Sequence, residues 1–183
     1  MARTAGKSNQ VRIIGGQWRR RILLFPDLPG LRPTPDRVRE TLFNWLGQRL
    51  DGLSCLDLFA GSGALGFEAA SRGAASVVMV ERDRQALAHL RAAREQLAAA
   101  QVELVLADAS SWLAGSRDTF DVIFLDPPFQ SGLLERVLPE AATRLAPEGK
   151  IYAEFGSRPA LEGLRVLREG RAGLSHFCLL ERA

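Results

Sequence analysis

Five continuous apolar runs, separated by alanine-rich stretches, constrain the fold of this 183-residue chain more than any other feature. Apolar runs without polar alternation are typical of parallel strands that are buried on both faces of a sheet. We therefore predict an α/β fold with a Rossmann-like, doubly wound sheet of seven strands, the last two at 164–168 and 176–181. The apolar runs fall at residues 54–59, 76–81, 102–107, 121–126 and 149–155, and the helical stretches at about 64–72, 84–99 and 132–146.

The charge of the chain is divided unevenly along its length. Residues 1–50 carry ten basic and three acidic side chains, whereas residues 51–183 carry fourteen basic and eighteen acidic ones. A basic front end on a mildly acidic body suggests a polyanion-binding segment attached to a catalytic or cofactor-binding domain. The predicted organisation follows this division: a disordered polar tail at 1–10, a basic hairpin and helix at 11–50, and the main domain at 51–183.

Two short apolar segments build the predicted hairpin. Val11–Ile14 and Arg21–Phe25 flank a turn that contains two glycines and two arginines. A loop marked by four prolines follows. We expect Thr34 or Asp36 to cap a helix over about residues 36–49, in which apolar side chains recur at helical spacing.

Several classes of site are disfavoured by the sequence. Cys55 and Cys178 lie inside apolar runs, which is typical of small buried side chains rather than of a disulfide or a nucleophile. No apolar stretch approaches the roughly 20 residues that span a bilayer, and the N-terminus lacks the apolar core of a secretory signal. No metal-ligand cluster has a convincing spacing. We expect a cytoplasmic monomer without a metal ion or a membrane contact.

A glycine-rich segment follows the first predicted parallel strand. Gly61-Ser62-Gly63-Ala64-Leu65-Gly66 fits the pattern G-x-G-x-x-G between a strand and a helix, and Glu81 ends the next strand 20 positions beyond Gly61. This is the fingerprint of a dinucleotide site with a ribose-binding carboxylate. The glycines alone therefore leave an NAD-dependent oxidoreductase open.

Charge separates the two interpretations of this loop. Asp57, Glu81, Asp108 and Asp126 all stand at the carboxyl ends of predicted strands, which converge on the ligand crevice in such sheets. Four carboxylates would repel the pyrophosphate of a dinucleotide. They suit S-adenosylmethionine, which carries a cationic sulfonium and an ammonium but no phosphate. We therefore predict this methyl donor, with S-adenosylhomocysteine as product.

Each part of the donor has a predicted partner. Asp57 is assigned to the methionine ammonium, Glu81 to the two ribose hydroxyls, and Asp108 to the adenine amino group, with Arg82 beside the adenine ring. The alternative for Asp108 is a helix N-cap for the segment from Ser110 onward. The remaining candidate contacts are Phe59, Ala60, Gly61, Ser62, Gly63, Ala109 and Asp126.

A four-residue segment, Asp126-Pro127-Pro128-Phe129, comes directly after an apolar strand. We interpret it as a rigid shelf for a flat base. An aromatic exocyclic amine is a weak nucleophile, because its lone pair is delocalised into the ring. The Asp126 carboxylate and the Pro127 carbonyl would accept its two N–H groups, Pro128 would fix the geometry, and Phe129 would stack on the base. Transfer is then a direct in-line displacement that depends on orientation and electrostatic preorganisation.

A base inside folded nucleic acid must be unstacked to reach such a shelf. The basic front end supplies candidate contacts for this step. Trp18 is predicted either to stack on an exposed base or to cover the hairpin as a hydrophobic side chain. The candidate phosphate contacts are Arg12, Arg19, Arg20, Arg21 and Arg32.

These segments together resemble a known family. Val11–Gly16, Arg32–Leu46, Asp57–Gly66 and Asp126–Phe129 are similar to the bacterial 16S ribosomal RNA guanine-N2 methyltransferases of the RsmD type, which have the class I methyltransferase fold. The resemblance covers nearly the whole chain after the first ten residues, and Arg32–Leu46 is its most specific part. It implies that this segment lies over the cofactor, with Thr34 and Arg37 as candidate contacts.

The resemblance also implies a substrate. The methyl group would go to N2 of one guanine in 16S rRNA, within an assembling or assembled small ribosomal subunit. DNA adenine-N6 and protein glutamine-N5 methyltransferases share the Pro-Pro shelf and stay open as alternatives. An RNA-binding assembly factor with an inactive methyltransferase fold is a further alternative from a different class.

Overall fold

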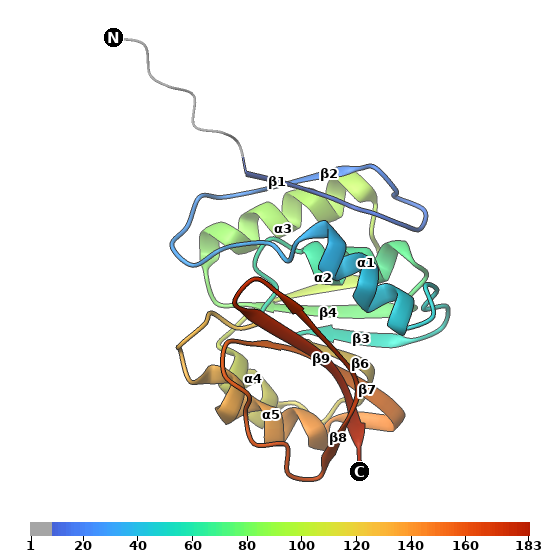
Figure 1. Ribbon diagram of the computed structural model, residues 1–183. Coiled ribbons are helices and arrows are strands. Elements are labelled where there is room, and N and C mark those ends of the chain that lie inside the picture. Colours follow the sequence, from blue (N-terminus) through green and yellow to red (C-terminus); the bar gives the residue numbers. More distant parts are fainter. Residues whose placement is uncertain (1–8) are drawn as a thin grey trace.

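The computed structural model describes residues 9–183, with two sheets and five helices (Figure 1). The tail predicted at 1–10 lies mostly outside the described residues, but Asn9 and Gln10 already belong to the first strand. The elements in chain order are β1 (Asn9–Arg12), β2 (Ile22–Phe25), α1 (Asp36–Trp45), β3 (Ser54–Asp57), α2 (Ala64–Ser71), β4 (Ser76–Glu81), α3 (Arg84–Leu97), β5 (Val102–Leu106), α4 (Ala109–Gly115), β6 (Phe120–Leu125), α5 (Leu133–Thr143), β7 (Leu145–Phe155), β8 (Leu164–Ala172) and β9 (Ser175–Arg182).

The main sheet confirms the predicted fold class. Its seven strands follow the order β5-β4-β3-β6-β7-β9-β8. Strands β3 to β7 pair in parallel, whereas β9 pairs antiparallel with both β7 and β8. The chain leaves β3 toward one edge through β4 and β5, and then returns to the other side of β3 with β6. The strand order therefore reverses between β3 and β6, which is where ligands bind in doubly wound sheets.

Helices cover both faces of this sheet. Figure 1 shows α1, α2 and α3 with the β1–β2 hairpin on one side, and α4 and α5 on the other. Alternate residues of each buried strand feed the two cores: Cys55 and Phe124 face the first, whereas Leu56 and Ile123 face the second. Strands buried on both faces account for the continuous apolar runs of the sequence.

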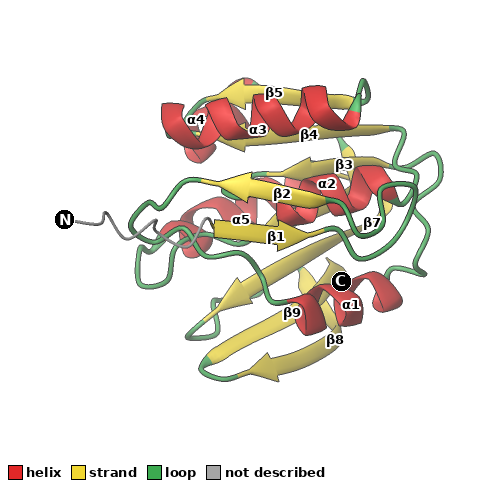
Figure 2. Cartoon of the chain, turned by 90° about the horizontal axis from the view of Figure 1, so that it is seen from above, coloured by secondary structure: helices red, strands yellow, loops and turns green. Residues whose placement is uncertain are grey.

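The N-terminal segment shares the first core with the main sheet. Val11, Ile13 and Leu23 of the hairpin region pack in the same buried cluster as Phe67 and Met79. Viewed from above, the hairpin lies across α2 and next to α3 (Figure 2). The hydrophobic core is therefore continuous across residue 50, where the charge of the sequence changes.

A buried carboxylate ties the same segment to α2. Glu68 is fully buried, and its oxygens accept hydrogen bonds from the backbone N–H groups of Ile14 (2.9 Å) and Gly15 (2.8 Å). They also pair with the guanidinium groups of Arg39 (3.3 Å) and Arg72 (2.9 Å). Burial lowers the pKa of Arg39, although the charge of Glu68 opposes that shift. Our sequence predictions did not include a role for Glu68, although a glutamate inside an apolar helix is a visible signal.

Several local details differ from the main predictions. Helix α1 begins at Asp36 after Pro35, and neither Thr34 nor Asp36 caps it through its side chain; the helix ends at Trp45, before the predicted limit. The short helix α4 was predicted only through the alternative role of Asp108 as a helix N-cap. Trp18 is only 9% exposed and packs in the first core, so its predicted alternative as hydrophobic cover is confirmed and base stacking is not.

Candidate functional site

A cavity of about 460 Å³ opens at the carboxyl ends of β3, β4, β6 and β7. This is the side of the sheet at which the strand order reverses. The loop of residues 28–35 from the N-terminal segment forms one wall, and the loop after β3 forms another. The cavity has the size of a small-molecule site, and four of the predicted carboxylates line it: Asp57, Glu81, Asp108 and Asp126.

Asp57 lies at the floor of this cavity and is only 1% exposed. Its Oδ2 accepts a hydrogen bond from the backbone N–H of Gly66 (3.0 Å), but its buried Oδ1 has no partner among the described residues. Burial is the main cause that raises the pKa of Asp57 to about 7, and the charge of Glu81 acts in the same direction. An unsatisfied buried carboxylate oxygen is costly, and a cationic ligand group would satisfy it.

The glycine loop brings backbone close to the cavity. Gly61 has φ +53°, and a Cβ built there would lie 2.9 Å from Leu31 Cδ1 of the opposite wall. Gly63 has φ +82°, but its built Cβ would meet the side chains of Phe67 and Leu90. Gly63 does not line the cavity. The first glycine therefore keeps the ligand space open, and the second allows helix α2 and α3 to pack behind it.

Glu81 joins the loop to the end of β4. Its Oε2 accepts the N–H of Gly61 (2.8 Å), and its Oε1 accepts the N–H of Asp83 (2.9 Å). Each carboxylate oxygen keeps further acceptor capacity. The side chain is held in place by backbone donors, which is the preorganisation expected of a carboxylate that receives hydroxyl groups.

Asp108 has the role that we gave as its alternative. It is the N-cap of α4, and its Oδ2 accepts the N–H and the hydroxyl of Ser111 (3.0 and 3.2 Å). The hydrogen bond from the Ser111 N–H is the main reason that the pKa of Asp108 is lowered. The residue also lines the cavity, together with Arg82 and Ala109. Its predicted contact with an adenine amino group stays a prediction.

The Asp126–Phe129 shelf forms the other end of the cavity, with Pro127 buried and Phe129 52% exposed. The Pro128 carbonyl accepts the Ser131 hydroxyl (2.6 Å). Asp126 Oδ2 accepts the Thr34 hydroxyl (3.1 Å). Burial, followed by the charge of Glu154 and a hydrogen bond with it, raises the pKa of Asp126. An exposed ring beside a partly buried carboxylate is suited to a flat ligand that enters from solvent.

The structure adds one residue that our sequence predictions missed. Glu154 lines the cavity and is 7% exposed, and its Oε1 accepts the Tyr152 hydroxyl (2.5 Å). It stands in the otherwise apolar run of residues 151–155 at the end of β7, and that break in the pattern was the available signal. Thr34, predicted as a cofactor contact, lines the cavity but contacts the shelf carboxylate.

The predicted RNA contacts are distributed over the N-terminal segment. Arg19 and Arg20 are exposed in the turn of the hairpin. Arg12 pairs with Asp36 (3.4 Å), and Arg21 donates to the Gln96 carbonyl of α3 (3.3 Å). Arg32 is exposed at the cavity. Arg37, predicted as a cofactor contact, is exposed and does not line the cavity.

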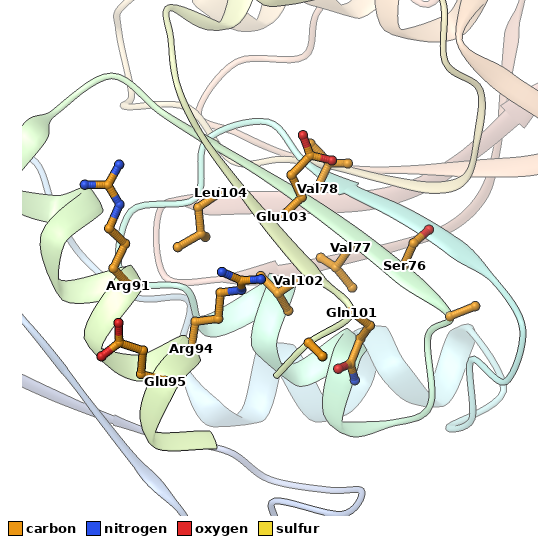
Figure 3. Close-up of a pocket in the computed structure, with 12 residues that line it drawn as sticks. Ser76, Val77, Val78, Arg91, Arg94, Glu95, Gln101, Val102, Glu103 and Leu104 are labelled. Atoms are coloured by element: carbon orange, nitrogen blue, oxygen red, sulfur yellow. The ribbon is translucent and has the colours of Figure 1, made fainter. Parts of the chain in front are cut away.

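A second cavity, of about 580 Å³, lies between α3 and the outer strands β4 and β5 (Figure 3). It sits at the amino ends of these strands, away from the point where the strand order reverses. Arg91, Arg94 and Glu95 stand on its helix side, and Figure 3 shows both apolar side chains and the polar Ser76 and Glu103 on its strand side. The convergent carboxylates make the first cavity the candidate site.

Metal-binding clusters and membrane-spanning helices are both absent from the described residues. Within residues 9–183, no group of three or more histidine, cysteine, aspartate or glutamate side chains could hold a metal ion. None of the described helices has the length and the apolar character needed to cross a membrane. Cys55 and Cys178 are buried free thiols, and burial raises the pKa of each to about 12.

Known proteins are similar to this chain over most of its length. The family model described as conserved hypothetical protein 95 matches residues 11–181. Ribosomal RNA small subunit methyltransferase D from Escherichia coli (strain K12) is 51% identical over 149 residues, which cover 80% of this chain and 75% of the relative. The protein of the same name from Haemophilus influenzae is 38% identical over 187 residues, 97% of both chains.

Solved structures agree with the sequence relatives. The methyltransferase yhhF from Escherichia coli superposes with a TM-score of 0.87 at 44% identity, covering 95% of this chain and 98% of that one. The methylase HI0767 from Haemophilus influenzae superposes with a TM-score of 0.81 at 36% identity, covering 95% and 99%. The resemblance drawn from the sequence is confirmed: the chain belongs to the RsmD family of class I methyltransferases.

Proposed function

We propose that the protein transfers a methyl group from S-adenosylmethionine to the exocyclic N2 of one guanine in small-subunit ribosomal RNA. The observation that carries the proposal is the continuity of one cavity from the unsatisfied Asp57 carboxylate to the Asp126–Phe129 shelf. Family membership supports a methyltransferase, and the relatives named small-subunit rRNA methyltransferases support the substrate.

The donor set of the cavity fits S-adenosylmethionine. Asp57 would hold the ammonium, since its buried Oδ1 lacks a partner. Glu81 would accept the ribose hydroxyls, and Asp108, Arg82 and Ala109 would surround the adenine. The remaining proposed contacts come from Phe59, Ala60, Gly61, Ser62 and Thr34, which line the cavity, with Gly63 behind it. When bound, the donor supplies an electrophilic methyl group on a positively charged sulfur.

The shelf prepares the amine for attack. Asp126 and the Pro127 carbonyl would each accept one N–H of the guanine amine, which localises the nitrogen lone pair for in-line displacement. Pro128 fixes the backbone of the shelf, and the exposed Phe129 ring would stack on the base. No group of this chain needs to form a covalent bond with either substrate. Orientation and electrostatic preorganisation then provide the acceleration.

The basic N-terminal segment, residues 9–50, would hold the RNA while the guanine is rotated out of its stack. Arg12, Arg19, Arg20, Arg21 and Arg32 are its proposed phosphate contacts. We propose a cytoplasmic monomer that acts on 16S rRNA within the small subunit, and the helices described show no span that would hold it in a membrane.

Methyl transfer to isolated small subunits that lack the modification tests this proposal. The protein is incubated with labelled S-adenosylmethionine, and the labelled nucleoside is identified after digestion of the RNA. We expect label in N2-methylguanosine. Label in N6-methyladenosine or only in ribosomal protein would favour the two alternative enzymes, and no transfer at all would favour the inactive assembly factor.

Asp126→Ala should abolish transfer and leave donor binding largely intact, because its carboxylate is assigned to the amine. Asp118→Ala is the matched control, since Asp118 is an exposed aspartate in the loop before the same strand. Transfer at the wild-type rate by the Asp126 variant would refute the acceptor role of this residue.

A further inference from the structure

Two acidic residues lie at the same level of the neighbouring strands β6 and β7. The parallel register pairs Phe124 with Tyr152 and Leu125 with Ala153, so the next residues on the two strands are Asp126 and Glu154. Side chains alternate between the faces of a sheet, so both residues follow Phe124 and Tyr152 onto the face that the N-terminal segment covers. The sheet register therefore places two carboxyl groups beside each other at the shelf.

The Thr34 hydroxyl bridges these carboxyl groups. Its Oγ1 lies 3.1 Å from Asp126 Oδ2 and 3.0 Å from Glu154 Oε1. The backbone carbonyl of Thr34 is held by the Nε of Arg39 (3.0 Å), a side chain that is itself buried and paired with Glu68. Thr34 is only 4% exposed, so the bridge lies in a protected and well-anchored position.

The two short contacts of the Thr34 hydroxyl need one more hydrogen than the hydroxyl itself has. A threonine hydroxyl has one hydrogen, and it can donate that hydrogen to only one of the two carboxyl oxygens. The other short oxygen–oxygen contact is favourable only if a carboxyl proton points toward Thr34. The Tyr152 hydroxyl supplies a hydrogen to Glu154 Oε1 but none to the bridge. One of the two carboxyl groups therefore carries a proton.

The surroundings of the pair keep that proton in place. Asp57 adds a further negative charge near Asp126, and the charges of Glu154 and Asp126 raise the pKa of Tyr152 in addition to its burial. Cys178 makes the smallest contribution to the raised pKa of Tyr152, and Arg32 and Arg82 line the same cavity as exposed side chains. Two carboxylates in contact at a buried site share a proton for the same reason in other enzymes.

We propose that Glu154 is a positioning residue for methylation, which shares one proton with Asp126 across the Thr34 hydroxyl and thereby sets the charge that Asp126 presents to the amine. The inference rests on the proposed function and deepens it. With the proton on Glu154, a chain of donors runs from Tyr152 through Glu154 and Thr34 to an ionised Asp126. The hydroxyl occupies Oδ2, and Oδ1 is then the oxygen offered to the substrate.

The pair also accounts for the proton that the reaction releases. The amine nitrogen forms a bond to the methyl carbon while the carbon–sulfur bond breaks and the sulfur keeps that electron pair. The nitrogen then loses one N–H proton and retains the electrons of the N–H bond. Asp126 Oδ1 takes this proton, so that the pair passes from one proton to two. The second proton returns to water after the methylated base has left.

Two substitutions should change different sides of the pH–rate profile. In the competent state Glu154 holds the shared proton and is neutral, so Glu154→Gln removes the ionisation that ends this state at high pH. The alkaline limb of kcat should disappear or move up, whereas the acid limb, which protonation of Asp126 sets, should stay within about one pH unit. In Thr34→Val the hydroxyl that favours the ionised Asp126 is lost, so the acid limb should move up. Glu148→Gln is the matched control, because Glu148 is an exposed glutamate on the same strand, and it should leave the profile unchanged.

Infrared spectra provide a readout that needs no substrate. At pH 7 the wild-type protein should show a protonated carboxyl band in addition to that of Asp57, and this additional band should be lost in Glu154→Gln and kept in Glu148→Gln. An unchanged band or an unchanged alkaline limb in a folded Glu154→Gln protein would overturn the proposal. If wild-type protein failed to methylate small subunits, the proposed function would fall, whereas the infrared comparison would still decide whether the proton is shared.

Discussion

Asp57 shows how one buried carboxylate couples the empty cavity to the stability of the fold. Its side chain is held by a backbone N–H on one oxygen and has no partner on the other, so burial dominates and raises its pKa to about 7. The folded state therefore binds a proton more tightly than the unfolded state does. The stabilisation is fully present below the ordinary aspartate pKa and is lost as the pH rises through 7.

Without donor, the wild-type free energy of unfolding should fall between pH 4 and pH 7, by at most about 4 kcal/mol from Asp57. Asp57→Asn should remove this part of the decrease, as measured by urea denaturation across the pH range. Asp118→Asn, at an exposed site, should keep the wild-type pH dependence. The same decrease in the Asp57 variant would show that the carboxylate is not responsible.

At the level of the elements, Glu68 joins the hairpin and α1 to α2. Its two oxygens satisfy two backbone N–H groups and two guanidinium groups, and it is fully buried. Glu68→Gln would leave Arg39 buried with weaker compensation, and we expect a loss of about 3–5 kcal/mol of stability. Urea denaturation of the wild-type and Glu68→Gln proteins measures this loss in the free energy of unfolding.

A second i,i+4 pair offers the control for that prediction. Glu140 and Arg144 of helix α5 are also joined (2.8 Å), but Glu140 is 44% exposed. Glu140→Gln should therefore cost less than about 1 kcal/mol. Equal losses in the two glutamine variants would mean that burial of the Glu68 network contributes no extra stability.

The elements also show what sequence patterns reveal and what they leave hidden. The five apolar runs and the glycine loop predicted the parallel strands and their helices, because local periodicity reflects burial on both faces of a sheet. Helix α4 was predicted only as the alternative in which Asp108 is an N-cap, because the helix is short and has two serines after its first alanine. Thr34 was misjudged as a helix cap because its hydroxyl bonds to residues that are 92 and 120 positions away. Such long-range partners have no local signature.

On the scale of the whole molecule, the basic segment and the sheet share one core. Trp18 belongs to the N-terminal segment, whereas Trp112 belongs to α4 and packs against the second core. Single-tryptophan proteins that keep one or the other should therefore unfold at the same urea concentration by fluorescence. An earlier transition at Trp18 would instead show that the N-terminal segment unfolds as a separate unit.

The salt dependence of RNA binding is also a property of the whole molecule. Replacing Arg19 and Arg20 by glutamine should weaken small-subunit binding and lower the slope of log K against log salt by about one per lost phosphate contact. Replacing the exposed Arg168 and Arg171 of β8 is the control, since Figure 1 shows this strand far from the hairpin. A reduced slope in the β8 variant alone would move the RNA surface to the other end of the molecule.

The central claim is that a row of carboxylates at the strand ends selects a cationic methyl donor over a phosphate-bearing cofactor. Isothermal titration of the protein with S-adenosylmethionine, S-adenosylhomocysteine and NAD tests it directly. We predict saturable binding of the first two, one molecule per chain, and none of NAD. Tight uptake of NAD without binding of the donor or its product would contradict the account.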